Sequence, residues 1–153
     1  MTRSRSVGGE FGDYPQNVTV IPDSTLVTQI DTWKAAGTVI EGVMVVIWSL
    51  SANWTASVST TNSLPELRIM HVENDADNTY LLTCEILGIV DDDDEWRSAN
   101  KIMEFDYTGS PSLGEQCQLN GTDCYTMKGV STAGAGKIVS IAEPTTAKIY
   151  VVL

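Results

Sequence analysis

His71 is the only histidine in the 153-residue chain, so acid–base chemistry that needs an imidazole would have to use this side chain. A metal site built from several histidines is therefore excluded. No serine stands in a Gly-x-Ser-x-Gly turn, which exposes the nucleophile of many hydrolases. Cys84 belongs to an alternating apolar run, a pattern typical of a thiol in the core. A catalytic triad that includes His71 remains an alternative, because residue counts alone do not exclude it. We expect no catalytic residue and no enzymatic activity.

Two acidic segments contain residue types that bind cations. Residues 91–95 are four aspartates followed by a glutamate, and residues 73–80 place Asp75, Asp77 and Asn78 close together. Calcium loops space their carboxylates and include a glycine at the bend, and an EF-hand adds a distal glutamate. The first segment has adjacent acids that repel one another, and the second lacks the glycine and the glutamate. We therefore expect solvated loops, with no metal and no cofactor.

The segment Gly134-Ala135-Gly136-Lys137 has the glycines and the lysine of a nucleotide-binding loop. A P-loop needs Gly-x-x-x-x-Gly-Lys-Ser/Thr at the start of a helix. Here position 131 is serine and Ile138 follows the lysine, in a run that is typical of a strand. The segment therefore predicts a turn before a strand over residues 137–142.

Charge and hydropathy restrict the classes of partner. The chain has 20 acidic and 9 basic residues, a net charge of −11, so it lacks the basic surface that general nucleic-acid binding needs. The same charge disfavours anionic membrane surfaces, and no run of 18 apolar residues is present to span a bilayer. We expect no nucleic-acid partner and no membrane partner.

Hydrophobic periodicity predicts a mainly β fold, a compact barrel or a sandwich with eight to ten short strands. The clearest strand patterns are residues 17–21, 38–48, 66–72, 79–90, 101–107, 136–142 and 147–153. Residues 24–36 predict one short helix, with Asp23 or Ser24 as the N-cap and Gly37 beyond its end; a strand is the alternative there. We expect a single domain over residues 17–153, with a possible seam near 91–100, and see no internal repeat of fixed period.

Three cysteines leave the redox state open. Asn120-Gly121 is a strong hairpin signal, and a two-residue loop there would place Cys117 opposite Cys124, within disulfide range. A four-residue loop would instead pair Leu119 with Cys124 and separate the two sulfurs. A disulfide between Cys117 and Cys124 is thus a conditional prediction, and two reduced thiols are the alternative.

Residues 1–16 contain three glycines, few apolar residues and no periodicity, which predicts an extended N-terminal arm. Such an arm would be held by a partner subunit, or else would fold back on its own domain. Its candidate partner-binding residues are Arg3, Arg5, Val7, Phe11 and Tyr14.

The pattern from Lys101 onward resembles a class of tailed-phage head decoration, or cement, proteins. The resemblance lies in Leu113-Gly114-Glu115, in the glycine-rich turn and strand over residues 134–139, and in Lys148-Ile149-Tyr150-Val151. It covers about a third of the chain and implies a β-tulip or SH3-like barrel. Proteins of this class bind the major capsid protein on the outer surface of the virion, often as trimers.

The resemblance implies a bacteriophage structural protein, made in the host cytoplasm, that stabilises the capsid. Each copy would bridge neighbouring capsomers through its N-terminal arm and through contacts between copies, with arm pairing along a partner's sheet edge. The alternative is a surface binding module of a virion or a cell, such as a receptor- or glycan-binding part of a fibre or tail.

Overall fold

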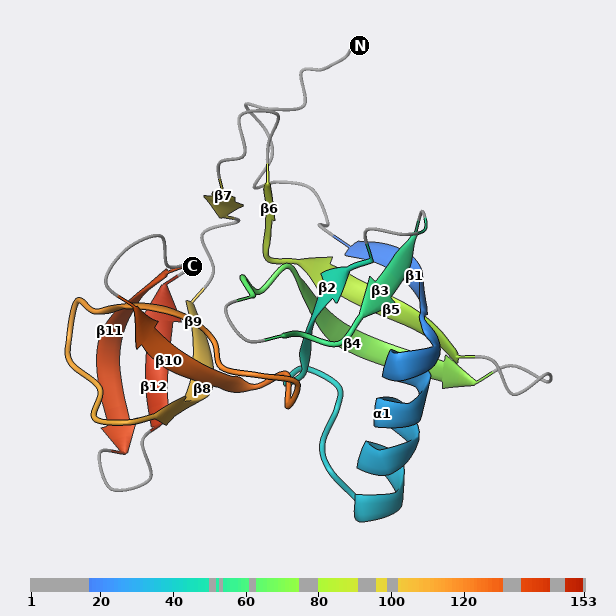
Figure 1. Cartoon of the computed structure of the whole chain (residues 1–153), viewed down its shortest axis with the longest axis horizontal. Helices are drawn as coiled ribbons and strands as arrows, with labels where there is room; N and C mark the ends of the chain where they lie inside the picture. The colour runs from blue at the N-terminus through green and yellow to red at the C-terminus, as the bar shows by residue number, and fades with distance from the viewer. Residues whose placement is uncertain are drawn as a thin grey trace, which may run out of the picture.

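The structure is a computed structural model, and it describes residues 17–49, 52, 54–60, 63–74, 80–90, 96–98, 102–130, 136–143 and 148–152. The described part is mainly β, with twelve strands and one helix. The strands form two five-stranded barrels that lie side by side, and the short pair β6 (Gly88–Val90) and β7 (Trp96–Ser98) connects them in the sequence (Figure 1). The predicted mainly β barrel class is confirmed.

The first barrel uses the first five strands of the chain. They are β1 (Asn17–Pro22), β2 (Val45–Trp48), β3 (Thr55–Ser57), β4 (Leu67–Asn74) and β5 (Tyr80–Ile86). β1 pairs with β3 in parallel, and the ring closes through antiparallel pairings in the order β3, β2, β4, β5 and back to β1. Closure leaves no free sheet edge in this barrel.

The helix α1 (Ser24–Ala36) has the predicted bounds. The Asp23 carboxylate accepts a hydrogen bond from the Leu26 N–H at 2.9 Å, which caps the first turn. Gly37 ends the helix in the left-handed region, at a φ of 71°. The apolar face of α1 packs its buried side chains into the core of the first barrel: Leu26, Ile30 and Trp33.

The second barrel uses the last five strands. They are β8 (Ile102–Thr108), β9 (Gln116–Leu119), β10 (Thr126–Val130), β11 (Gly136–Glu143) and β12 (Lys148–Val152). β8 pairs with β10 in parallel, and antiparallel pairings run through β10, β9, β11, β12 and back to β8. Numbered within each barrel, both therefore have the strand order first, third, second, fourth, fifth, with the same single parallel pair.

The match extends to individual residues. The β4 strand has a bulge between Ile69 and His71 in its pairing with β5, and β11 has a bulge between Ile138 and Ser140 in its pairing with β12; β11 has a further irregularity, between Ile141 and Glu143, that β4 lacks. Because bulges are specific features of a strand pairing, this agreement aligns the two barrels residue by residue. We call two residues equivalent when they hold the same place in this shared register.

The turns before the second strand of each barrel also agree. The Gly42 N–H donates to the Ile69 carbonyl at 2.8 Å, and the Gly114 N–H donates to the Ile138 carbonyl at 2.8 Å. Both glycines have positive φ, at 79° and 83°. The described strands thus form a tandem structural repeat, with one barrel arrangement used twice.

The repeat was not visible in the sequence because its spacing drifts. Asn17 is equivalent to Ile102, 85 positions later, whereas Leu82 is equivalent to Ile149, only 67 positions later. The helix α1 lies between the first two strands of the first barrel, and a short connection replaces it in the second. No fixed period survives such a difference.

The two barrels exchange core residues. Cys124, from the loop between β9 and β10, is buried in the core of the first barrel, and Tyr125 packs against the same core. Val45 of β2 and Leu87, which follows β5, are buried in the core of the second barrel. Because each core contains side chains of the other barrel, the chain is one body with two cores.

Two details of the sequence prediction are wrong. The run 38–48 is not one strand: β2 begins only at Val45, after the turn at Gly42, and Val39 and Val43 are exposed. The β9–β10 loop spans residues 120–125 rather than two residues, so Leu119 lies opposite Met127.

Candidate functional site

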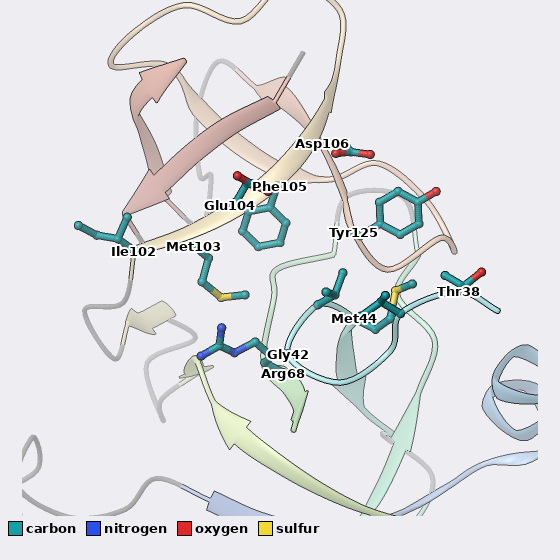
Figure 2. A pocket seen from close by; sticks show the side chains of 12 residues that line it. Thr38, Gly42, Met44, Arg68, Ile102, Met103, Glu104, Phe105, Asp106 and Tyr125 are labelled. Carbon is teal, nitrogen blue, oxygen red and sulfur yellow. The ribbon is translucent and has the colours of Figure 1, made fainter. Parts of the chain in front are cut away.

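A groove separates the two barrels on one side of the molecule (Figure 2). One wall is the turn ahead of β2 together with Arg68 of β4, and the other is β8 with Tyr125. Figure 2 shows Met103 and Arg68 on these opposite walls. The cavity volume is about 410 Å³, near the lower end for sites that bind small ligands.

Among the described residues that line this groove, the charged groups are one cation and two acids. The Arg68 guanidinium donates to the Glu85 carboxylate at 2.6 Å, so its charge is already balanced within the first barrel. Glu104 and Asp106 lie on the β8 wall. The remaining polar lining groups are the hydroxyls of Thr38 and Tyr125, so the groove can bind a group but offers no nucleophile–base pair.

The barrels meet at the side of this groove. The Val45 N–H donates to the Cys124 carbonyl at 2.8 Å, and the Leu119 N–H donates to the Ser63 carbonyl at 2.9 Å. The Ser59 hydroxyl donates to the Gly121 carbonyl at 2.5 Å. The end of β9 and the β9–β10 loop of the second barrel thus form the surface that binds the first barrel.

On the equivalent surface of the first barrel, the described residues are exposed or half-buried. Trp54 is 63% exposed and contacts Trp48 edge to face, with the ring centroids 6.1 Å apart. The Ile21 N–H donates to the Trp54 carbonyl at 2.9 Å, and Ile21 is 49% exposed. Continuing the β1–β5 register one step past Val20 places Ile21 opposite the exposed Leu81. We call Trp48, Trp54, Ile21 and Leu81 the apolar face.

Trp54 lies in the left-handed region, at a φ of 56°. A bulky residue with positive φ is uncommon and costs of order 1–2 kcal/mol. Backbone strain of this kind is concentrated at functional positions. The backbone strain and the exposed ring together make Trp54 a candidate functional residue of the first barrel.

Leu113 is an exposed apolar residue of the second barrel. It lies in the turn ahead of β9, next to Gly114, and is 67% exposed. This turn corresponds to the turn ahead of β2, which forms the wall of the groove opposite Tyr125. The sequence pattern did not show that Leu113 and Trp54 lie on surfaces corresponding to the two sides of the contact between the barrels, because the repeat itself was not visible.

His71 lies on the surface, outside the groove, with 58% of its side chain exposed. Its Nδ1 is 2.8 Å from the Glu41 carboxylate and its Nε2 is 3.9 Å from that of Glu73. The Val72 N–H also donates to Glu41, and this bond, with the one to His71, lowers the pKa of the Glu41 carboxyl. No serine or cysteine lies among the described partners of His71, so the alternative of a triad gains no support.

The predicted disulfide is wrong, because the three described cysteines are free thiols. Cys117 lies opposite Gly129 in the second core, whereas Cys124 is buried in the first core. Burial raises the pKa of the Cys84 and Cys117 thiols to about 12, and burial also raises that of Cys124. These thiols are core residues rather than nucleophiles.

The other predicted sites lie partly outside the described residues. The arm residues Arg3, Arg5, Val7, Phe11 and Tyr14 and the acidic segments 75–79 and 91–95 belong to that undescribed part. Lys137 is described, in strand β11. Among the residues that the structure describes, no group of three or more acidic, histidine or cysteine side chains could hold a metal ion. No helix in the described ranges is long and apolar enough to cross a membrane.

Comparison of the chain with protein-family models, with curated proteins and with solved structures gives no match.

Proposed function

We propose that this protein is a structural subunit of a virus particle, a capsid decoration protein that binds the outer shell and works through contacts with other subunits. The observation that carries the proposal is the apolar face, where Trp54 holds a large exposed ring on a strained backbone beside Ile21. Exposed contiguous apolar surface marks interaction sites, and tryptophan is enriched at the energetic centres of interfaces.

The body of the protein supports the same proposal. Two barrels with exchanged core residues form a rigid block, and the groove between them lacks a nucleophile–base pair. A rigid block with an exposed apolar face is suited to bearing load between neighbours. Under the proposal, the arm over residues 1–16 contacts the major capsid protein, while the apolar face makes contacts between copies, and many weak contacts act together by avidity.

The test is co-sedimentation of the full chain with shells assembled from the major capsid protein encoded in the same genome. We expect saturable binding to the shells. The double substitution Arg3→Glu with Arg5→Glu should reduce the bound copies per shell, since it reverses both charges of the arm. Lys34→Glu with Lys137→Glu makes the same charge change at exposed positions of α1 and β11 and should bind as the wild type does.

Absence of the protein from the pellet of intact shells would contradict the proposal. Equal loss of binding in both double variants would contradict the part assigned to the arm, since net charge alone would then explain the effect.

The Trp48–Trp54 pair also favours a second candidate, a surface module that binds glycans or a receptor, because exposed aromatic rings stack on sugars. That candidate predicts quenching of Trp54 fluorescence by a bound sugar, with loss of the signal in Trp54→Asn. Sugar binding without shell binding would favour this candidate over the decoration protein.

A further inference from the structure

The contact between the two barrels is a template for a contact between copies. Within the chain, the end of β9 and the β9–β10 loop of the second barrel bind Val45 at the start of β2 and Ser59 and Ser63 after β3. Tyr125, from the same loop, packs against the first core and lies across the groove from the turn ahead of β2. Both surfaces belong to a repeated unit. Each therefore has an equivalent surface on the other barrel that the internal contact does not use.

The first unused surface is the apolar face of the first barrel. Trp54 is equivalent to Tyr125, since its carbonyl accepts from the Ile21 N–H as the Tyr125 carbonyl accepts from the Asp106 N–H at 3.2 Å. Tyr125 is half-buried and packs against the first core, whereas Trp54 is 63% exposed. The same position of the repeat is thus covered by the first barrel when it lies in the second barrel, and is exposed to solvent when it lies in the first.

The second unused surface is the turn ahead of β9. Its glycine makes the same backbone hydrogen bond as the glycine of the turn ahead of β2, at 2.8 Å in each barrel. In the first barrel this turn faces Tyr125 across the groove. In the second barrel it has the exposed Leu113.

We propose that copies of this protein associate head to tail, with the apolar face of one copy's first barrel bound to the turn ahead of β9 on the next copy's second barrel. The contact between copies repeats the contact within the chain. This inference deepens the proposed function by naming a second copy as the partner of the apolar face, and it needs no capsid shell for its test.

The pairing is heterologous, because two different surfaces meet. A heterologous contact continues from copy to copy until the rotation closes a ring, or else it makes a filament. A ring built this way alternates first and second barrels around one axis, with every neighbouring pair of barrels in a similar contact. The ring size follows from the rotation per step.

Three matched substitutions test the geometry: Trp54→Asn, Leu113→Asn and Ile102→Asn. Asparagine tolerates the left-handed backbone, so Trp54→Asn removes the ring without adding strain. Ile102 is 65% exposed, close to the values for the other two residues. It lies on the β8 wall of the groove and on neither of the two surfaces proposed to join copies, so Ile102→Asn is the control. Mass by light scattering after size-exclusion chromatography is the readout, and circular dichroism shows that each variant is folded.

We expect the wild type and Ile102→Asn to form one closed oligomer, and Trp54→Asn and Leu113→Asn each to be smaller. Loss of a central interface tryptophan typically weakens association by about thirtyfold or more. The decisive sample is the equimolar mixture of Trp54→Asn and Leu113→Asn. Each variant keeps one intact surface, so the mixture forms a heterodimer through the single intact contact and stops there.

Other outcomes overturn the proposal. A wild type that is monomeric at about 100 µM would show that the apolar face does not bind a second copy. If Trp54→Asn breaks the oligomer while Leu113→Asn does not, the face pairs with itself or with another surface. Loss of shell binding with the oligomer intact would instead count against the proposed function and leave head-to-tail association standing.

Discussion

The two barrels share one pairing scheme but close their interiors with different chemistry. Three equivalent positions show the difference. The first barrel has apolar side chains there: Pro22, Met44 and Val58. At the same positions, in the same order, the second barrel has a hydrogen-bonded pair beside a glycine: Tyr107, Glu115 and Gly129. The Tyr107 hydroxyl donates to the Glu115 carboxylate, and both groups lie against the bare backbone of Gly129. The same five-stranded barrel therefore tolerates apolar or polar interior side chains, provided that the polar groups are hydrogen-bonded.

The barrels also differ in where the buried side chains of each core come from. The first core includes the apolar face of α1. The second barrel has no described helix, and its core includes Val45 and Leu87 from the first half of the chain. We infer that the second barrel depends on the first for stability more than the first depends on the second.

The largest expected effect comes from breaking the contact at Cys124. Cys124→Asp places a carboxylate in the first core, and burial of an unpaired charge costs several kcal/mol. We expect the barrels to uncouple, so that calorimetry of the variant shows two unfolding transitions, with the second barrel melting first. The wild type should unfold in one transition.

Cys124→Ala is the control for this prediction. Cys124 has a φ of 68°, a conformation that aspartate adopts more readily than alanine does. The backbone therefore favours the aspartate variant, and a larger loss in it must come from the buried charge. A single transition in Cys124→Asp would show that the two cores do not depend on this side chain.

The second prediction concerns the filling of the second barrel. A Cβ at residue 129 would lie 2.5 Å from the Glu115 Cδ and 2.5 Å from the Tyr107 hydroxyl oxygen. Gly129→Ala should therefore lower the free energy of unfolding in urea by about 2–3 kcal/mol, the upper part of the usual range of about 1–3 kcal/mol for overpacking. Gly121→Ala is the control, since no atom lies within 4 Å of its Cβ position. Equal effects of the two substitutions would contradict the tight packing over Gly129.

The third prediction compares one tyrosine from each barrel. Tyr107→Phe leaves the half-buried Glu115 without its donor, which should cost about 1–3 kcal/mol. Tyr80→Phe should cost less, because the Asp31 carboxylate that accepts from Tyr80 is exposed and water can replace the hydroxyl.

The Tyr107 prediction has a dependence on pH. Burial and the bond to Glu115 raise the pKa of Tyr107 above its ordinary value of about 10. The stabilisation is complete below the pKa of the unfolded chain and is lost as the pH rises through the folded-state pKa. The advantage of the wild type over Tyr107→Phe should therefore shrink above about pH 10 in urea titrations. A constant difference across that range would contradict the assignment.

Local signals in the sequence predicted the elements but not their duplication. The bounds of α1 follow from Asp23, Gly37 and the apolar spacing between them, which are short-range effects. The disulfide prediction failed because the loop conformation at Asn120-Gly121 is determined by long-range contacts, with Cys124 drawn into the other barrel. The apolar face could not be predicted, since it is recognised only by comparing Trp54 with the covered Tyr125.

The smallest expected effect concerns Glu66, a half-buried carboxylate of the first barrel. Glu66 accepts a hydrogen bond from the Trp48 N–H at 2.9 Å. Desolvation by burial raises its pKa, and the bond to Trp48 opposes part of that rise. The folded state therefore favours the protonated form, and the wild type loses stability as the pH rises through the folded-state pKa of this group.

Glu66→Gln should remove this loss while keeping the acceptor for Trp48. We expect the variant to be more stable than the wild type at pH 7, because it no longer has to bury a charged carboxylate. The difference should vanish below about pH 4, where the glutamate is neutral in both states. Glu104→Gln, at an exposed position of β8, makes the same change in net charge and should leave stability unchanged. If both glutamine variants gain equally at pH 7, the gain comes from the reduced net charge of this acidic chain rather than from the burial of Glu66.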